Sequence, residues 1–251
     1  MGNLAFFRFI RDNRMGSFSV RNINCEWGLK GIEKYKQVSD VIIIVDVLSF
    51  STSVDVALSS GAIIYPYKFK DETSYLYARQ VRAELASLTR SKDKYSLSPA
   101  SLVNIEKGKR LILSSPNGAE LALSTCSRLT LCACLRNCQA VAEYAMQQGE
   151  SILVVPAGEK WDDGSIRFSL EDYIGSGAVI SFLQGNFSME SKSAVNLFNS
   201  FKDNLFDGVS NTISGIELIK RGFEEDISIA SEFNVSKTVP LLRENSFINR
   251  G

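Results

Sequence analysis

The sequence predicts an α/β protein, a three-layer α/β/α fold built on a mostly parallel sheet. Between about residues 40 and 185, short β-branched runs alternate with amphipathic helical stretches. The runs are apolar almost throughout, which is typical of parallel strands covered on both faces. The 251 residues, 45% of them hydrophobic, suffice for one large domain. Two closely joined lobes, about 1–185 and 186–251, are the alternative organisation.

Five segments have the composition of buried strands. They read VIIIVDVLS (41–49), AIIYPY (62–67), RLILSS (110–115), LTLCACL (129–135) and SILVVPA (151–157). Upstream, residues 17–28 are expected to form a strand of an antiparallel hairpin, with Trp27-Gly28 marking its turn. Downstream, residues 190–251 read as helices followed by a closing strand at 237–248.

The helical stretches begin at residues that favour helix starts. One stretch starts among the hydroxyls of 49–53 and ends at Gly61, and two others start at Asn117 and Asn137. Another starts at Ser169, with Asp172 three residues later, which predicts a capping box that has Asp in place of Glu or Gln.

Composition excludes several classes of function. Lys+Arg and Asp+Glu number 28 each, so the chain as a whole does not attract nucleic acid or an anionic membrane. The chain has no histidine, which rules out a Ser-His-Asp or Cys-His site. Carboxylates, hydroxyls, thiols, Lys and Arg remain, a set that suits hard cations such as Mg²⁺.

No stretch is apolar for long enough to span a membrane, and no secretory leader is evident in residues 1–16. A cytoplasmic protein is therefore expected. Four of the five cysteines lie between Cys126 and Cys138 without zinc or redox spacing. We interpret them as buried thiols, with a reactive Cys138 as the alternative.

Polar residues follow the expected strands at their carboxyl ends, where ligands bind in sheets of this kind. Asp46 is followed by Ser49, Ser51 and Thr52 at the start of the next helix, whose free amides favour phosphate. Asp46 could equally cap that helix or pair with an arginine.

Two further segments reach the same edge. Ser115 precedes Asn117-Gly118, which either lets backbone amides approach a ligand or forms an ordinary turn. Glu171 and Asp172 lie at a helix start, as catalytic acids or as a complement to the helix dipole. The polar stretch 89–101 is the one obvious long loop and could serve as a lid or a binding loop.

Taken together, these segments resemble a known family. The order EWG, IIIVDVL, NGAELAL, RNCQAVA, AGEKW, FSLEDYIGSGAVI and the closing 215–247 segment is similar to that of the 2-phosphosulfolactate phosphatases, Mg²⁺-dependent enzymes associated with coenzyme M biosynthesis. The resemblance covers nearly the whole chain, as one domain.

The resemblance assigns roles residue by residue. Asp46 matches the family's Asp, but Ser49 stands where the family has Arg. The family's Asn-Gly falls on Asn117-Gly118, and its Leu-Glu-Asp ends on Glu171 and Asp172. Ser115 takes the place of a family Thr, and Asn137 matches the Asn at the start of a helix.

The loop at 89–101 departs furthest from the family pattern. It lacks the family's glycines and its Glu-Arg pair and keeps Ser98-Pro99. The missing cations must be replaced if the substrate is to be neutralised. Four arginines could do so if the fold brings them in: Arg79, Arg82, Arg90 and Arg167.

The resemblance implies a Mg²⁺-dependent phosphatase that acts on 2-phosphosulfolactate or a related 2-phospho acid. Asp46, Glu171 and Asp172 would bind Mg²⁺ or orient water, with Asp46 as a covalent nucleophile left open. The substrate's phosphate would lie against a set of polar residues: Ser49, Ser51, Thr52, Ser115, Asn117, Gly118 and Asn137.

The expected partner is a small anionic substrate, with no nucleic acid and no membrane, and a homodimer is a possible assembly. Two other functions stay open. The chain could be a degenerate relative that binds a small anionic metabolite without turnover. It could also bind a nucleotide, although neither GxGxxG nor GxxxxGK[ST] is present.

Overall fold

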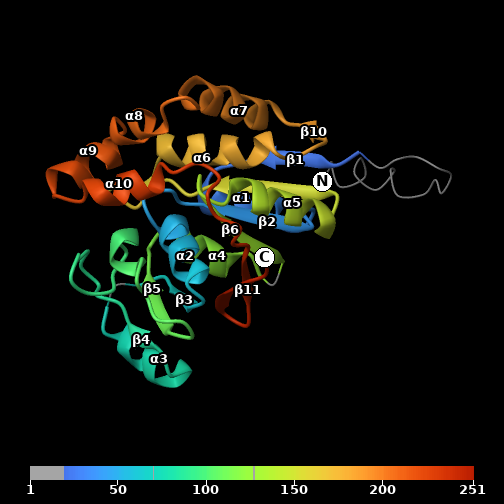
Figure 1. Cartoon of the computed structure of the whole chain (residues 1–251). Coiled ribbons are helices and arrows are strands. Elements are labelled where there is room, and N and C mark those ends of the chain that lie inside the picture. The colour runs from blue at the N-terminus through green and yellow to red at the C-terminus, as the bar shows by residue number, and fades with distance from the viewer. Residues whose placement is uncertain (1–19, 70, 127) are drawn as a thin grey trace.

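A ten-stranded sheet forms the centre of the molecule (Figure 1). The computed structural model describes residues 20–251 except 70 and 127, so the expectations for residues 1–19 lie outside the described residues. The strands lie side by side in the order β10-β1-β7-β2-β6-β11-β12-β3-β5-β4. Their bounds are β1 Asn22–Cys25, β2 Val41–Val45, β3 Ile63–Tyr67, β4 Glu84–Leu85, β5 Arg110–Ser114, β6 Leu129–Ala133, β7 Ser151–Pro156, β10 Asn186–Phe187, β11 Pro240–Arg243 and β12 Ser246–Asn249.

All five expected strands are present, as β2, β3, β5, β6 and β7. β2 lies between β6 and β7 and runs parallel to both. Every residue of β2 is buried, as its apolar composition predicts. The prediction of a mostly parallel sheet is therefore confirmed.

Strand β1 does not belong to an antiparallel hairpin. It pairs in parallel with β7 on one side and β10 on the other. Trp27 and Gly28 do not form a hairpin turn, because helix α1 (Gly28–Tyr35) starts there. A helix that follows a strand carries the chain across a face of the sheet, and the next strand then runs parallel. The expectation of an antiparallel hairpin strand at 17–28 was therefore wrong for the described residues, 20–28.

The C-terminal segment forms two strands where one was expected. β11 and β12 pair antiparallel, and the turn between them has Glu244 and Asn245 at φ 49° and 65°. Two consecutive positive φ values are typical of a type I′ hairpin turn. The hairpin lies between β6 and β3 and pairs antiparallel with each, so it joins the two parallel groups of strands.

Helices cover both faces of the sheet. Val41, Ile43 and Val45 pack against the layer that contains α5, α6 and α7, whereas Ile42 and Ile44 pack against the layer that contains α1, α2 and α4. The helix bounds are α2 Phe50–Ser59, α3 Thr73–Val81, α4 Gly118–Ser124, α5 Cys138–Gln148, α6 Leu170–Ser181, α7 Met189–Phe201, α8 Leu205–Ser210, α9 Ile213–Lys220 and α10 Glu224–Ala230, with a 3₁₀ helix, η1, at Pro99–Leu102. The three-layer α/β/α architecture is as predicted.

The sheet draws strands from both sides of residue 185, since β10, β11 and β12 follow that point in the chain. A separate small hairpin, β8 (Glu159–Lys160) and β9 (Ile166–Arg167), follows β7. Within the part of the chain that the structure describes, no helix combines the length and the apolar character needed to cross a bilayer.

Candidate active site

Asp46 directly follows β2 and connects the starts of two helices. Its Oδ1 accepts a hydrogen bond from the amide of Phe50 at 3.0 Å, at the first residue of α2. Its Oδ2 accepts one from the amide of Gly118 at 2.9 Å, at the first residue of α4. The side chain therefore does cap a helix, as one of the two interpretations held, and it caps a second one as well.

Gly118 permits this close approach. A Cβ at this position would lie 2.6 Å from Asp46 Oδ2 and 2.5 Å from the Phe50 ring. Any side chain would therefore separate the two helix starts. The Asn-Gly step predicted at the end of β5 is needed here for close packing against a carboxylate.

Asp172, in the first turn of α6, holds two more segments. Its Oδ1 accepts from the Val47 amide at 2.7 Å and its Oδ2 from the Gly158 amide at 2.9 Å. The expected capping box at Ser169 is absent, because the Asp172 carboxylate points to these loops instead. Ser169 is the N-cap residue, but its buried hydroxyl has no partner among the described residues.

Glu171 completes a group of three buried acids. Asp46, Glu171 and Asp172 are only 6%, 2% and 4% exposed. Burial raises the pKa of Asp46 to about 6, with a further contribution from the charge of Glu171. Burial and the charges of Asp46 and Glu171 raise the pKa of Asp172 well above its usual range. The three predicted acids are therefore brought together at the carboxyl end of β2.

Glu159 is a fourth acid of this site, and it is not among the site residues predicted from the sequence. It lies on β8, where its Oε2 accepts a hydrogen bond from Asn117 Nδ2 at 2.7 Å. Burial, then the charge of Asp46, raises the pKa of Glu159 to about 7. Its place after β7, at the ligand-binding edge of the sheet, was the signal that could have identified it.

Arg90 reaches Ser49, the residue that stands where the family pattern has an arginine. Its Nη2 donates to Ser49 Oγ at 3.0 Å, and its other terminal nitrogen pairs with Asp226, which is 1% exposed. The positive charge of Arg90 also acts on Asp46. The loop that departs most from the family pattern therefore delivers a cation to the site.

The other three arginines divide into two groups. Arg167 lies opposite Glu159 in the β8–β9 hairpin, and its charge acts on that carboxylate. Arg79 is on α3, and Arg82 is the residue that caps its C-terminal end. Both line a groove beside that helix, together with Tyr75, Leu76 and Leu85. Arg90 and Arg167 are thus the two that the fold brings to the acids.

Several predicted phosphate ligands have their side chains engaged with the protein itself. Ser51 Oγ accepts from the Asp46 amide at 2.9 Å, and Thr52 Oγ1 donates to the Val47 carbonyl at 2.7 Å. Ser115 Oγ accepts from the Asn117 amide at 3.3 Å. Asn137 accepts from the Cys134 amide and donates to the Thr238 carbonyl. These four position the loops around the acids, and contact with a phosphate stays a prediction for each.

Cys138 gives no sign of a reactive thiol. It is buried at the start of α5, and burial raises its pKa to about 12. Cys132, on β6, and Cys134, just after it, are buried as well. Cys126, by contrast, is exposed. The interpretation of the four clustered cysteines as buried thiols is therefore confirmed for Cys132, Cys134 and Cys138 and wrong for Cys126.

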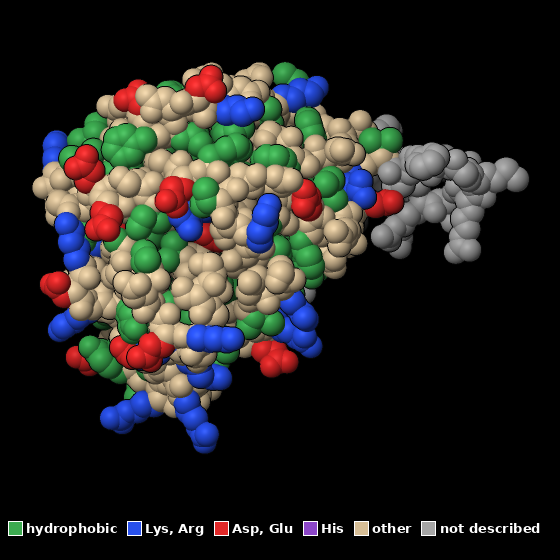
Figure 2. Space-filling view, viewed as in Figure 1, with side chains coloured by type: hydrophobic (Ala, Val, Ile, Leu, Met, Phe, Trp, Pro, Cys, Tyr) green, Lys and Arg blue, Asp and Glu red, His purple; other side chains and the backbone are tan. Residues whose placement is uncertain are grey.

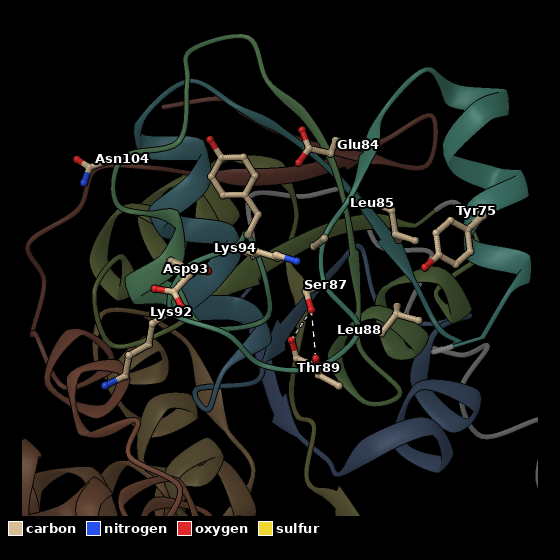
Figure 3. A pocket seen from close by; sticks show the side chains of 13 residues that line it. Tyr75, Glu84, Leu85, Ser87, Leu88, Thr89, Lys92, Asp93, Lys94 and Asn104 are labelled. Atoms are coloured by element: carbon tan, nitrogen blue, oxygen red, sulfur yellow. Dashed lines mark hydrogen bonds between the residues drawn. The ribbon is translucent and has the colours of Figure 1, made fainter.

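A cavity of about 770 Å³ lies apart from the acids, beside β4 and the loop that follows it (Figure 3). Tyr75, Leu85, Ser87 and Lys94 are among its lining residues. None of the predicted site residues lines it. Size alone therefore does not make it the active site.

Comparison with known proteins identifies the family. The family model of 2-phosphosulpholactate phosphatase matches residues 29–245. The chain belongs to this family. It is 31% identical over 218 residues to a probable 2-phosphosulfolactate phosphatase of Carboxydothermus hydrogenoformans, covering 83% of this chain and 89% of the relative.

Two further relatives agree with this assignment. A probable 2-phosphosulfolactate phosphatase of Thermotoga maritima is 30% identical over 221 residues, 82% of this chain and 90% of its own. The 2-phosphosulfolactate phosphatase of Methanothermobacter thermautotrophicus is 27% identical over 212 residues, 82% of this chain and 88% of its own. The names of these relatives denote a phosphoric monoester hydrolase.

Proposed function

We propose that the protein is a Mg²⁺-dependent phosphatase that hydrolyses 2-phosphosulfolactate or a related 2-phospho acid to the 2-hydroxy acid and phosphate. The observation that carries this proposal is the group of buried acids, Asp46, Glu171 and Asp172, beside the cation of Arg90. Family membership supplies the reaction class. The acids lie at the carboxyl end of β2, where sheets of this kind bind ligands.

The donor set fits a Mg²⁺ ion. The negative charges of these acids repel one another, and this repulsion raises the pKa of Asp46 and of Asp172. A divalent cation bound between the acids would offset the repulsion. Within the described residues no three His, Cys, Asp or Glu side chains are placed so that they could hold a metal ion together, so waters and the substrate would have to complete its coordination. Mg²⁺ commonly retains several waters and needs only one or two carboxylates besides the substrate phosphate.

One or two of Asp46, Glu171 and Asp172 would hold the ion, which would supply positive charge to the phosphoryl oxygens when bound. In the proposed reaction a water oxygen forms a bond to phosphorus while the bond between phosphorus and the substrate's 2-oxygen breaks. One carboxylate accepts a proton from the water, and the 2-oxygen ends protonated as the hydroxyl of the product. Arg90 lies beside Ser49 and would neutralise part of the substrate's charge.

The test is phosphate release from a panel of phosphomonoesters at pH 7. We expect release from 2-phosphosulfolactate with Mg²⁺, its loss in excess EDTA, and its return when Mg²⁺ exceeds the chelator. A control variant, Asp163→Asn, removes an exposed acid at the tip of the β8–β9 hairpin and should retain the wild-type rate. An undiminished rate in EDTA would contradict the assignment of Mg²⁺.

A second function, binding without turnover, is favoured by one observation. Both oxygens of Asp46 and both of Asp172 already accept backbone amides, which is also what purely structural carboxylates do. Wild-type protein that releases no phosphate from any ester, yet is stabilised against heat by Mg²⁺ and phosphate together, would support this function over catalysis.

A further inference from the structure

Three cationic side chains surround one aromatic ring beside the candidate site. The guanidinium carbons of Arg90 and Arg221 lie 5.6 and 5.7 Å from the centre of the Phe223 ring, and the ammonium nitrogen of Lys92 lies 5.9 Å from it. Arg90 and Lys92 come from the loop before η1, whereas Arg221 and Phe223 lie between α9 and α10. Each cation gains from the ring, but the three repel one another.

The positive charge of this cluster is only partly offset. Asp226 pairs with Arg90. Neither Lys92 nor Arg221 forms an ion pair with any described residue. Both side chains belong to exposed residues, so an incoming ligand can reach them. The cluster therefore offers two cations that are free to bind an anion.

The cluster is continuous with the candidate active site. Arg90 is its inner member, because it donates to Ser49 Oγ only three residues after Asp46. Lys92 and Arg221 form its outer end. Lys92 also lines the cavity beside β4, and Figure 3 shows its side chain extending from the loop toward the C-terminal helices, whereas Lys94 of the same loop points away from them. Figure 2 shows Lys and Arg side chains along the left edge of the view, where the loop approaches α10 in Figure 1.

We propose that Arg90, Lys92 and Arg221 form a subsite for a second anionic group of the substrate, a carboxylate or a sulfonate attached a few bonds from the phosphate. The inference rests on the proposed function and specifies its substrate class. The phosphate would lie at the acids and the second anion against the cations around Phe223. An ester whose organic part is neutral would leave the subsite empty.

The first experiment compares two esters, 2-phosphosulfolactate and phenyl phosphate, at low ionic strength. The quantity compared is kcat/KM for 2-phosphosulfolactate divided by kcat/KM for phenyl phosphate. Lys92→Met and Arg221→Met should each lower this ratio about tenfold, which corresponds to the loss of one hydrogen bond to a charged group. Lys94→Met and Lys220→Met remove neighbouring cations that are not among the described cations stacked on Phe223, and both variants should leave the ratio unchanged. An unchanged ratio in Lys92→Met and Arg221→Met would overturn the inference.

A second measurement does not depend on turnover. Calorimetric titration with sulfolactate should show that Lys92→Met and Arg221→Met weaken binding about tenfold, and that 0.5 M NaCl weakens wild-type binding because salt screens exposed charges. If wild type hydrolyses neither ester but binds sulfolactate in this way, the proposed function fails and the subsite stands. If sulfolactate binds equally well to both variants, or does not bind wild type, the subsite is contradicted.

Discussion

The carboxylates of Asp46 and Asp172 each hold two backbone segments, and this accounts for their burial at the end of a strand. An ionised side chain is costly to bury unless its oxygens are hydrogen-bonded. Phe50, Gly118, Val47 and Gly158 supply those hydrogen bonds through their amides. The same bonds fix the carboxylates in place, so a ligand would meet acids that are already positioned.

The sequence predicts the position of Asp46 but not its partners. An acid after an apolar strand and before a cluster of hydroxyls is a local pattern. Gly118, which donates to it, lies 72 residues away, and nothing near either residue indicates the contact. Glu159 was missed for the same reason, since Asn117, its hydrogen-bond partner, is 42 residues distant.

The raised pKa of Glu159 makes folding stability depend on pH. Burial raises this pKa from 4.5 to about 7, so the folded protein retains a proton that the unfolded chain releases. The resulting stabilisation is present below about pH 4.5 and is lost as the pH rises through about 7. In Glu159→Gln, which cannot titrate, the fall in Tm between pH 5.5 and 7.5 without Mg²⁺ should be smaller by about 4–7 °C.

Thermal unfolding of the two proteins across this pH range checks the prediction. Asp203→Asn serves as a control, because it removes an exposed acid from the loop between α7 and α8. Parallel Tm profiles for wild type and Glu159→Gln would show that Glu159 has an ordinary pKa in the folded protein.

At the scale of elements, strands with a continuous β-branched composition were predicted correctly, because that composition reports burial on both faces. The composition of a strand does not indicate which other strands it pairs with. β1 was assigned to a hairpin, yet its hydrogen bonds go to β7 and β10, which lie more than a hundred residues further along the chain. The hairpin of β11 and β12 was not resolved into two strands because its turn has Glu-Asn rather than the usual Asn-Gly.

The turn of that hairpin gives a direct test of its conformation. Asn245 has a φ of 65°, which a β-branched residue adopts only with strain. Asn245→Val should therefore lower the free energy of unfolding by about 1–2 kcal/mol, whereas Asn245→Gly should leave it unchanged or raise it slightly. Urea denaturation of both variants measures these effects. Equal stability of the two variants would contradict a type I′ turn.

The whole molecule shows why the composition of the chain indicated the fold class more clearly than the arrangement of the sheet. Alternating strands and helices predict three layers, whatever the order of the strands. The order itself is set by pairings that are remote in sequence, above all the C-terminal hairpin, which inserts between β6 and β3. This hairpin joins the two parallel groups of strands into one sheet. At the junction, α2 packs against β3, β6, β11 and β12.

The arrangement also places the site. Acids from β2 and α6, the β8–β9 hairpin and the loop that carries Arg90 meet at one edge, although 126 residues separate Asp46 from Asp172 along the chain. Each segment is ordinary by itself. The combination of buried acids with a neighbouring arginine arises only when the whole chain is folded, and the proposal of a phosphatase depends on that combination.

The rate of phosphate release by Asp46→Asn tests this account most directly. With Mg²⁺ and 2-phosphosulfolactate, we predict a rate at least about 10³-fold below wild type, because a neutral amide can neither bind a cation nor accept a proton in place of the carboxylate. Circular dichroism should show that the fold is retained, and the control Asp162→Asn in the exposed hairpin tip should keep the wild-type rate. A folded Asp46→Asn protein that releases phosphate as fast as wild type would contradict the account.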